Sequence, residues 1–117
     1  MFGFSKKYTY VTVYFLNGNK PYNYKSRDLR IRYGDIVMVK RGPATQPALV
    51  TKAEVIKSSQ LPKSANRIPD VLGFADQKTK NMFKPRELKR IRNLAKKAET
   101  NNLIDEIELF EAATDDY

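Results

Sequence analysis

The residues of this sequence whose types and spacing suggest chemistry are aromatic and cationic. Tyr8, Tyr10 and Tyr14 recur at even spacing in a β-branched and aromatic run. Alternate residues of a strand point to one face, so the three rings would form a platform on which unpaired bases stack, at about 1–3 kcal/mol per base. The alternative is that these rings pack beneath other elements of the same chain.

The candidate phosphate contacts are lysines and arginines in two groups. One group follows the aromatic run, and the other lies on one side of a C-terminal helical segment. These predicted nucleic-acid-binding residues are Lys25, Arg27, Arg30, Arg32, Lys40, Arg41, Lys89, Arg92 and Lys96. Cations at this density bind phosphates and release their counterions. The alternative is an ordinary solvated surface.

Catalytic chemistry has little support in the sequence. The chain contains no Cys and no His, which removes thiol nucleophiles, imidazole bases, disulfides and the usual zinc ligands. Its acids show no spacing that predicts a site, and it has neither a glycine-rich phosphate loop nor a calcium loop. We therefore expect a protein that is not an enzyme and has no cofactor, no metal and no small-molecule substrate.

The net charge of +9 is unevenly distributed along the chain. Residues 1–57 and 58–97 each carry eleven cations against three anions, whereas residues 98–117 carry seven anions and no cation. A basic body with an acidic tail favours a polyanionic partner, or a tail that competes with one. A tail that serves only solubility is the alternative.

Membrane association is not expected. No apolar run approaches the roughly 20 residues that a membrane-spanning helix needs. Residues 1–7 lack the long apolar region of a secretion signal. We therefore expect a cytoplasmic location.

A hairpin is the element that must position the tyrosines. Tyr8–Leu16 has the composition of a strand, and Asn17-Gly18 is a preferred pair for a two-residue hairpin turn into a strand over 21–25. A loop one residue longer would move Tyr22 and Tyr24 to the opposite face. With the two-residue loop, the expected core face consists of Val11, Val13, Phe15, Tyr22 and Tyr24.

Three further strands are expected. Gly34-Asp35 predicts a tight turn into a strand over 36–40, and residues 41–47, with two prolines, predict a loop. Residues 48–57 predict a long strand with a bend or bulge, and 68–75 a short edge strand. Closure of such strands into a small barrel would remove exposed edges.

Two helices are expected at the C-terminus, after an irregular segment over 76–84. Pro85 is favoured at a first helical position. The first helix would bury Leu88, Ile91, Leu94, Ala95 and Ala98 on one side. Asn101-Asn102 predicts a break before a second, acidic helix, which would fold back on the first or form a homodimer. Its apolar stripe consists of Leu103, Ile104, Ile107 and Phe110.

Three short patterns carry a resemblance to known proteins. They are Tyr-x-Tyr at Tyr22–Tyr24, Gly-Asp-x-Val-x-Val at Gly34–Val39 and Ala-x-Val-Ile at Ala53–Ile56. The first half of the chain resembles the N-terminal DNA-binding domain of the primosomal replication helicase, and small-barrel proteins of phages and mobile elements of Gram-positive bacteria. The resemblance implies a small SH3-like antiparallel β-barrel over 1–76. The helical extension over 77–117 departs from the family pattern, and together the two parts predict an α+β fold. The resemblance assigns no site residue.

The sequence thus predicts a non-enzymatic nucleic-acid-binding or replication-accessory protein of phage or mobile-element type. DNA is the favoured partner. A module that binds another protein, or that has a structural role, is the alternative.

Overall fold

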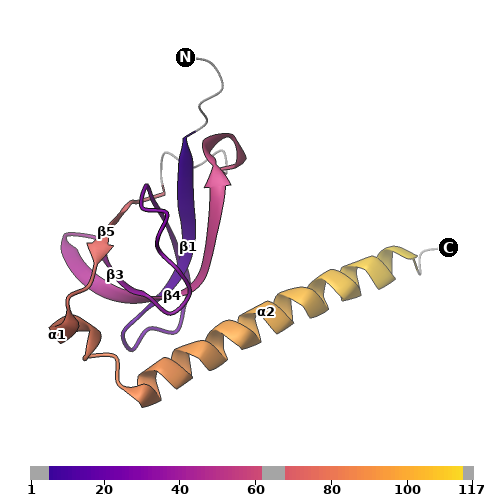
Figure 1. The fold of residues 1–117 in the computed structure, drawn as a ribbon. Helices are drawn as coiled ribbons and strands as arrows, with labels where there is room; N and C mark the ends of the chain where they lie inside the picture. The colour runs from indigo at the N-terminus through magenta and orange to yellow at the C-terminus, as the bar shows by residue number, and fades with distance from the viewer. Residues whose placement is uncertain (1–5, 62–67, 115–117) are drawn as a thin grey trace.

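The computed structural model describes residues 6–61 and 68–114, without the side chains of 101–114. Five strands form one antiparallel sheet in the order β2-β1-β4-β3-β5, which curls into a half-barrel followed by two helices (Figure 1). The elements are β1 (Lys7–Phe15), β2 (Tyr22–Ser26), β3 (Ile36–Arg41), β4 (Ala44–Lys57), a 3-10 turn (Ser58–Gln60), β5 (Val71–Phe74), α1 (Gln77–Lys80) and α2 (Pro85–Thr114). The α+β class is confirmed, and full barrel closure stays a prediction.

The β1–β2 hairpin has the predicted register but a different turn. Val13 pairs with Tyr22, as expected. The tight turn, however, joins the Phe15 carbonyl to the Gly18 amide at 2.9 Å, with Asn17 at φ 62°. The two-residue loop is therefore wrong, because the connection runs over residues 16–21. Pairing of β1 with β2 ends at Val13 and Tyr22, which leaves three residues on each side of Asn17-Gly18, so the register does not shift.

The turn before β3 is confirmed. Gly34 has φ 90°, a conformation that favours glycine, and the Asp35 amide donates to the Arg32 carbonyl at 3.1 Å. The Asp35 carboxylate in turn accepts from the Arg32 amide at 2.8 Å. This closed turn fixes the direction in which the chain enters β3.

The loop expected over 41–47 is wrong, since β4 already begins at Ala44 after a turn at Gly42-Pro43. Pro47 pairs with Met38 of β3, while β1 ends opposite Ala48. At Pro47, β4 therefore has a neighbour on one side only, which is where a sheet tolerates proline.

The bulge expected in the long strand is confirmed. Thr12 of β1 pairs with Lys52 and Val13 pairs with Val50, so Thr51 is the extra residue of β4. A bulge bends its strand and increases the local twist. β4 can therefore pair with β3 through its first part and with β1 through its second.

The two faces of the sheet carry separate hydrophobic clusters. The cluster on one face consists of Val11, Val13, Phe15, Tyr24, Ile31, Val37, Val39, Ala48 and Val50. The cluster on the other face consists of Tyr14, Ile36, Leu49, Ala75, Phe83 and Ile91. Tyr22, expected in the core, is 38% exposed on the edge strand and packs edge-on against Phe15. The second cluster holds α2 against the sheet.

The segment over 76–84 is not irregular throughout. It contains the one-turn helix α1, whose first turn is capped by the Asp76 carboxylate, which accepts from the Thr79 amide at 2.8 Å. This hydrogen bond holds the pKa of Asp76 below its ordinary value. The cap satisfies an amide that has no partner within the helix.

Helix α2 begins at Pro85, as predicted, and the predicted stripe is buried at Ile91 and half-buried at its other positions. Ile91 is fully buried, and Leu88, Leu94 and Ala95 pack beside it. The break at Asn101-Asn102 is wrong, because α2 continues to Thr114 and its second half extends away from the sheet (Figure 1). An acidic helix that folds back is therefore excluded. The apolar stripe over 103–110, which the sequence offers as a homodimer contact, consists of side chains that the structure does not describe.

Candidate nucleic-acid interface

The end of the β1–β2 hairpin opposite its turn carries a tyrosine and an arginine side by side. Arg27 directly follows β2, and its Cζ lies 5.4 Å from the centroid of the Tyr8 ring. Arg27 is exposed and Tyr8 is half-buried. Both line an open hollow of about 480 Å³, together with Lys25, Ser26, Asp28, Asp70 and Val71. The hollow is thus bordered by an aromatic ring, a guanidinium group and two carboxylates.

A second arginine–aromatic pair lies beside this hollow. Arg30 contacts Asp28 through two hydrogen bonds, from Nε at 3.0 Å and from a terminal nitrogen at 2.8 Å. The hydrogen bonds from Arg30 lower the pKa of Asp28 to about 2. The Arg30 Cζ lies 5.6 Å from the centroid of the Phe74 ring. The ion pair with Asp28 compensates the charge of Arg30 and fixes its guanidinium group near Phe74.

Lys25 joins the two edges of the sheet. Its Nζ lies 2.9 Å from the Asp70 carboxylate and donates to the Ile68 carbonyl at 2.6 Å, while its backbone amide donates to the Pro69 carbonyl at 3.1 Å. The Lys25 side chain is only 16% exposed. Lys25 therefore serves first to hold β2 against the segment before β5, which corrects its assignment as an available phosphate contact.

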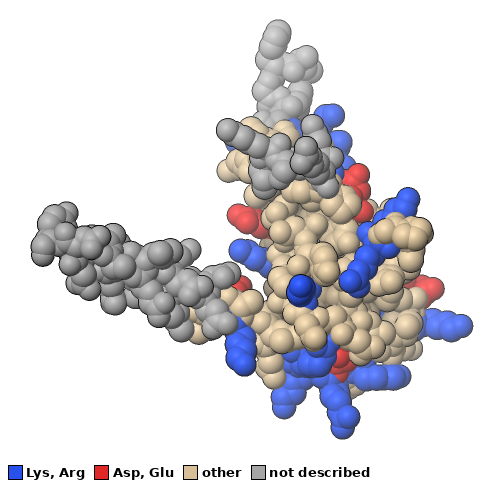
Figure 2. Space-filling view, turned by 180° about the vertical axis from the view of Figure 1, so that it is seen from behind, with Lys and Arg blue, Asp and Glu red and all other residues tan. Residues whose placement is uncertain are grey.

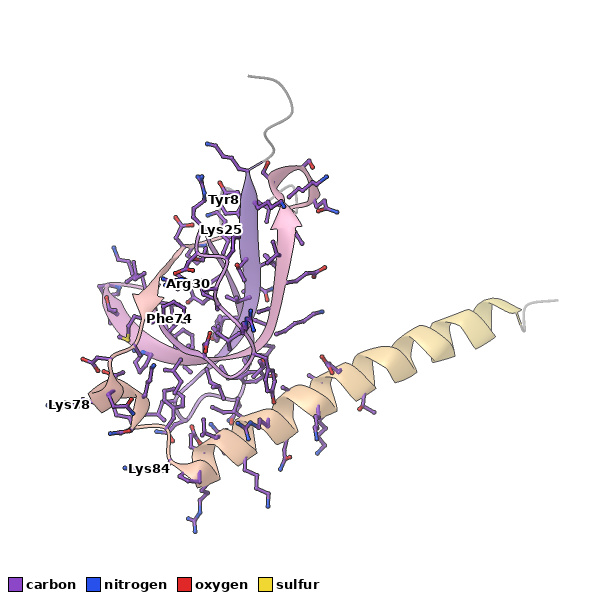
Figure 3. The ribbon with its side chains drawn as sticks, viewed as in Figure 1. Tyr8, Lys25, Arg30, Phe74, Lys78 and Lys84 are labelled. Atoms are coloured by element: carbon purple, nitrogen blue, oxygen red, sulfur yellow. The ribbon has the colours of Figure 1, made fainter. Side chains whose placement is uncertain are left out.

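These side chains form part of a strip along one side of the molecule. Figure 3 shows Tyr8, Lys25, Arg30, Phe74, Lys78 and Lys84 following one another from the upper end of the sheet to the start of α2. We define the basic–aromatic strip as Tyr8, Arg27, Arg30, Phe74, Lys78 and Lys84. Among the described residues, Arg27, Lys78 and Lys84 have no carboxylate within ion-pair distance. The strip therefore has compensated charges at its centre and uncompensated cations at its ends.

The lower end of the strip merges with a cationic surface on the two helices. Figure 2 shows Lys and Arg side chains gathered around the end of the molecule where α1 and the start of α2 lie. The exposed cations of this helical surface are Lys78, Lys80, Lys84, Arg86, Lys89, Arg92, Lys96 and Lys97. Within the described residues, Arg90 is the one cation of 78–97 with an ion-pair partner, Glu87. The exposed positions expected for Lys89, Arg92 and Lys96 are confirmed.

The tyrosine platform does not form as the sequence suggested. Tyr14 is 2% exposed and packs in the cluster beneath α2, and this burial raises its pKa. No base can stack on a ring covered by a helix, so Tyr14 is removed from the candidate site. Tyr10 is half-buried between Lys25 and Glu54 on the neighbouring strands. Of the three tyrosines, Tyr8 alone joins the strip.

The remaining predicted cations lie elsewhere. Arg32 is exposed in the turn before β3, and Lys40 is exposed near the end of β3. Arg41 forms a third arginine–aromatic group, with its Cζ 4.7 Å from the Phe15 ring and 5.3 Å from the Tyr22 ring. This group borders a separate hollow of about 330 Å³. The structure therefore does not bring Arg41 into the strip.

Sequence reasoning missed three residues of the strip: Phe74, Lys78 and Lys84. The run Val71-Leu72-Gly73-Phe74 indicated an edge strand, and an aromatic residue on an edge strand is a candidate for an exposed contact. Lys78 and Lys84 lie in the segment that was expected to be irregular. Their recurrence with Lys80 before Pro85 was the available indication of a cationic surface.

Comparisons with protein-family models, with curated proteins and with solved structures found no match to this chain. The resemblance to small-barrel DNA-binding proteins therefore stays a prediction. Among the described residues, no three acidic side chains converge as a metal ion would require. Within the same residues, no helix combines the length and the apolar character needed to cross a membrane.

Proposed function

We propose that this chain is a nucleic-acid-binding protein without catalytic activity, of the replication-accessory type found in phages and mobile elements. In this proposal the curled sheet closes as a small SH3-like barrel. DNA is the partner that the resemblance favours. The bound polymer contacts the helical surface and the basic–aromatic strip through its phosphates.

One observation carries the proposal, namely the eight exposed cations between Lys78 and Lys97. Figure 2 shows Lys and Arg side chains gathered at the end of the molecule where the helices begin. Like charges at close range repel one another, and a solvated surface usually mixes both signs. A surface on which cations greatly outnumber anions is typical of proteins that bind phosphates and release counterions.

The sheet gives this surface a fixed position. Ile91 and Phe83 are buried in the cluster that holds the helices against the sheet. Lys89 lies two residues before Ile91 and Arg92 directly after it, and both are exposed, so burial of the apolar stripe turns these cations outward. The backbone that carries the cations is therefore ordered before a polyanion arrives, which lowers the entropy cost of binding.

Fluorescence anisotropy with labelled single-stranded and duplex DNA at several salt concentrations tests the proposal. We expect the logarithm of the binding constant to fall linearly with the logarithm of salt concentration. The double variant K78A/K84A removes two phosphate contacts, so the slope should become shallower by about 1.4 for single strands and about 1.8 for duplex. RNA of the same sequence, measured in parallel, tests the preference for DNA.

The matched control is R32A/K40A, which removes the same charge outside the strip and the helical surface. Arg32 is exposed in the turn before β3, and Lys40 is exposed near the end of β3. This control should leave the slope near that of the unmodified protein. Absence of binding at low salt, or equal losses in the two double variants, would contradict the proposed interface.

A further inference from the structure

The centre of the basic–aromatic strip differs chemically from its ends. At the centre, Arg30 is held by Asp28 and Lys25 by Asp70, with distances of 2.8 and 2.9 Å. Phe74 is 39% exposed beside them. A paired carboxylate cancels the charge that attracts a phosphate, so Arg30 in the strip and the neighbouring Lys25 are less suited to bind phosphates than the unpaired cations at the ends. The centre is thus better suited to a flat, weakly charged group.

We infer that the centre of the strip binds an unpaired nucleic-acid base, so the ligand of this surface is a single strand. This inference rests on the proposed function and narrows it. The base adds to the stack of Phe74 and the guanidinium group of Arg30, and Tyr8, which lines the neighbouring hollow, offers a ring to a second base. Arg27 at one end, and Lys78 and Lys84 at the other, bind the flanking phosphates.

The fixed position of Arg30 supports this division of roles. Asp28 accepts from the side chain of Arg30 and also from its backbone amide at 3.0 Å, so the guanidinium group is oriented before any ligand binds. A planar guanidinium group stacks on bases as aromatic rings do. Because the guanidinium group lies over the Phe74 ring, the two groups form one stack before any ligand binds, and a base adds to this stack at small entropy cost.

The hollow supports the same conclusion. Its volume is about 480 Å³, and it lies between Tyr8 and the Lys25–Asp70 pair. In a duplex the faces of the bases are covered by their neighbours, so Phe74 and Tyr8 would have nothing to stack on. In a single strand the bases can turn outward, and each stacked base adds affinity with little dependence on sequence.

The test compares full-length Phe74→Leu with the unmodified protein by fluorescence anisotropy. The probes are a labelled oligothymidine strand and a blunt-ended duplex of two annealed strands with the same total phosphate count. Leucine keeps an apolar side chain on the edge strand and removes the ring. We expect oligothymidine affinity to fall about 5-fold or more, with an unchanged salt slope and a duplex affinity within about 2-fold.

Three further variants test whether the aromatic ring itself is responsible for single-strand affinity. Phe74→Tyr keeps the ring and should retain single-strand affinity, and Tyr8→Leu should lower it as Phe74→Leu does. The matched control is Tyr33→Leu, because Tyr33 is 57% exposed and has no arginine over its ring among the described residues. This control should bind like the unmodified protein.

The two proposals fail in different ways. If the unmodified protein binds neither probe at low salt, both proposals are overturned. If it binds both probes with a steep salt dependence, and Phe74→Leu binds oligothymidine as tightly as before, then only the single-strand inference is overturned. Equal losses for oligothymidine and duplex in Phe74→Leu would also overturn it, because stacking on an unpaired base would not be the cause.

Discussion

Replacing Glu87 with alanine should loosen α2 from the sheet. The Glu87 carboxylate accepts from the Asn17 amide at 2.6 Å and from two nitrogens of Arg90 at 2.5 and 2.8 Å. Arg90 also donates to the Asn19 side chain at 3.0 Å. The first turn of α2 is thereby fastened to the loop between β1 and β2.

The expected loss of unfolding free energy in Glu87→Ala follows from these contacts. Glu87 is 13% exposed, and a hydrogen bond from a backbone amide to such a carboxylate contributes about 1.5–3 kcal/mol. Arg90 is 33% exposed, so solvent screening limits the ion pair to about 0–1 kcal/mol. We expect Glu87→Ala to lower the free energy of unfolding by about 2–3 kcal/mol. At about 4 °C per kcal/mol for a chain of this size, Tm should fall by about 8–12 °C.

The pH dependence gives a second measure of the same contact. The hydrogen bonds from Arg90 hold the pKa of Glu87 below its ordinary value of 4.5. A carboxyl group whose pKa is lowered by folding stabilises the fold above its ordinary pKa, and this contribution is lost as pH falls through the lowered value. The Tm difference between the protein and Glu87→Gln should therefore be largest near neutral pH and shrink in acid.

Thermal unfolding followed by circular dichroism at pH 7 and at pH 3 measures both effects. Glu54→Ala is the matched control, because Glu54 is exposed on β4 and has no hydrogen-bonded partner among the described side chains. Its Tm should stay within about 2 °C of the unmodified protein. If Glu87→Ala unfolds at the same temperature as Glu54→Ala, the reasoning is refuted.

The remaining predictions concern a carboxylate, a turn and a core residue. Because the pKa of Asp28 is lowered from 3.8 to about 2, its stabilising effect should be lost over that interval, and Asp28→Asn should flatten an acid titration of Tm there. Gly34→Ala should cost about 1–2 kcal/mol, because alanine is strained at φ 90° although its Cβ would meet nothing within 4 Å; Gly34→Asn should cost less in the same urea titration. Ile91→Ala should cost about 2–5 kcal/mol in urea, since Ile91 is fully buried, whereas Asn93→Ala on the exposed side of α2 should change stability by less than about 0.5 kcal/mol.

Local patterns predicted much of the sheet. The alternation of Val11 and Val13 with polar or aromatic neighbours set the buried face of β1, and burial of one face then fixed the register with Tyr24. Gly34 predicted its turn because few residues tolerate its backbone conformation. Pro85 likewise marked the start of α2, where its missing amide costs nothing.

The sequence predictions failed where the local conformational preference was weak and tertiary packing determined the structure. Asn101-Asn102 lies within a continuous helix because asparagine costs less than about 1 kcal/mol there, and leucine, isoleucine and glutamate follow it. Tyr14 was assigned to an exposed face because the sequence does not show that α2 covers that face. Nor does the sequence show that Lys25 meets Asp70, a residue far away along the chain.

The shape of β4 has a consequence for synthesis of the chain. Residues 48–57 of β4 pair with β1, yet they leave the ribosome long after β1 has done so. At about 5–20 residues per second, the edge of β1 that β4 later covers stays open for about 2–8 s. That edge is rich in valine, threonine and tyrosine, a composition prone to intermolecular pairing. Slower translation after Phe15 should therefore lower the yield of soluble protein, and faster translation should raise it.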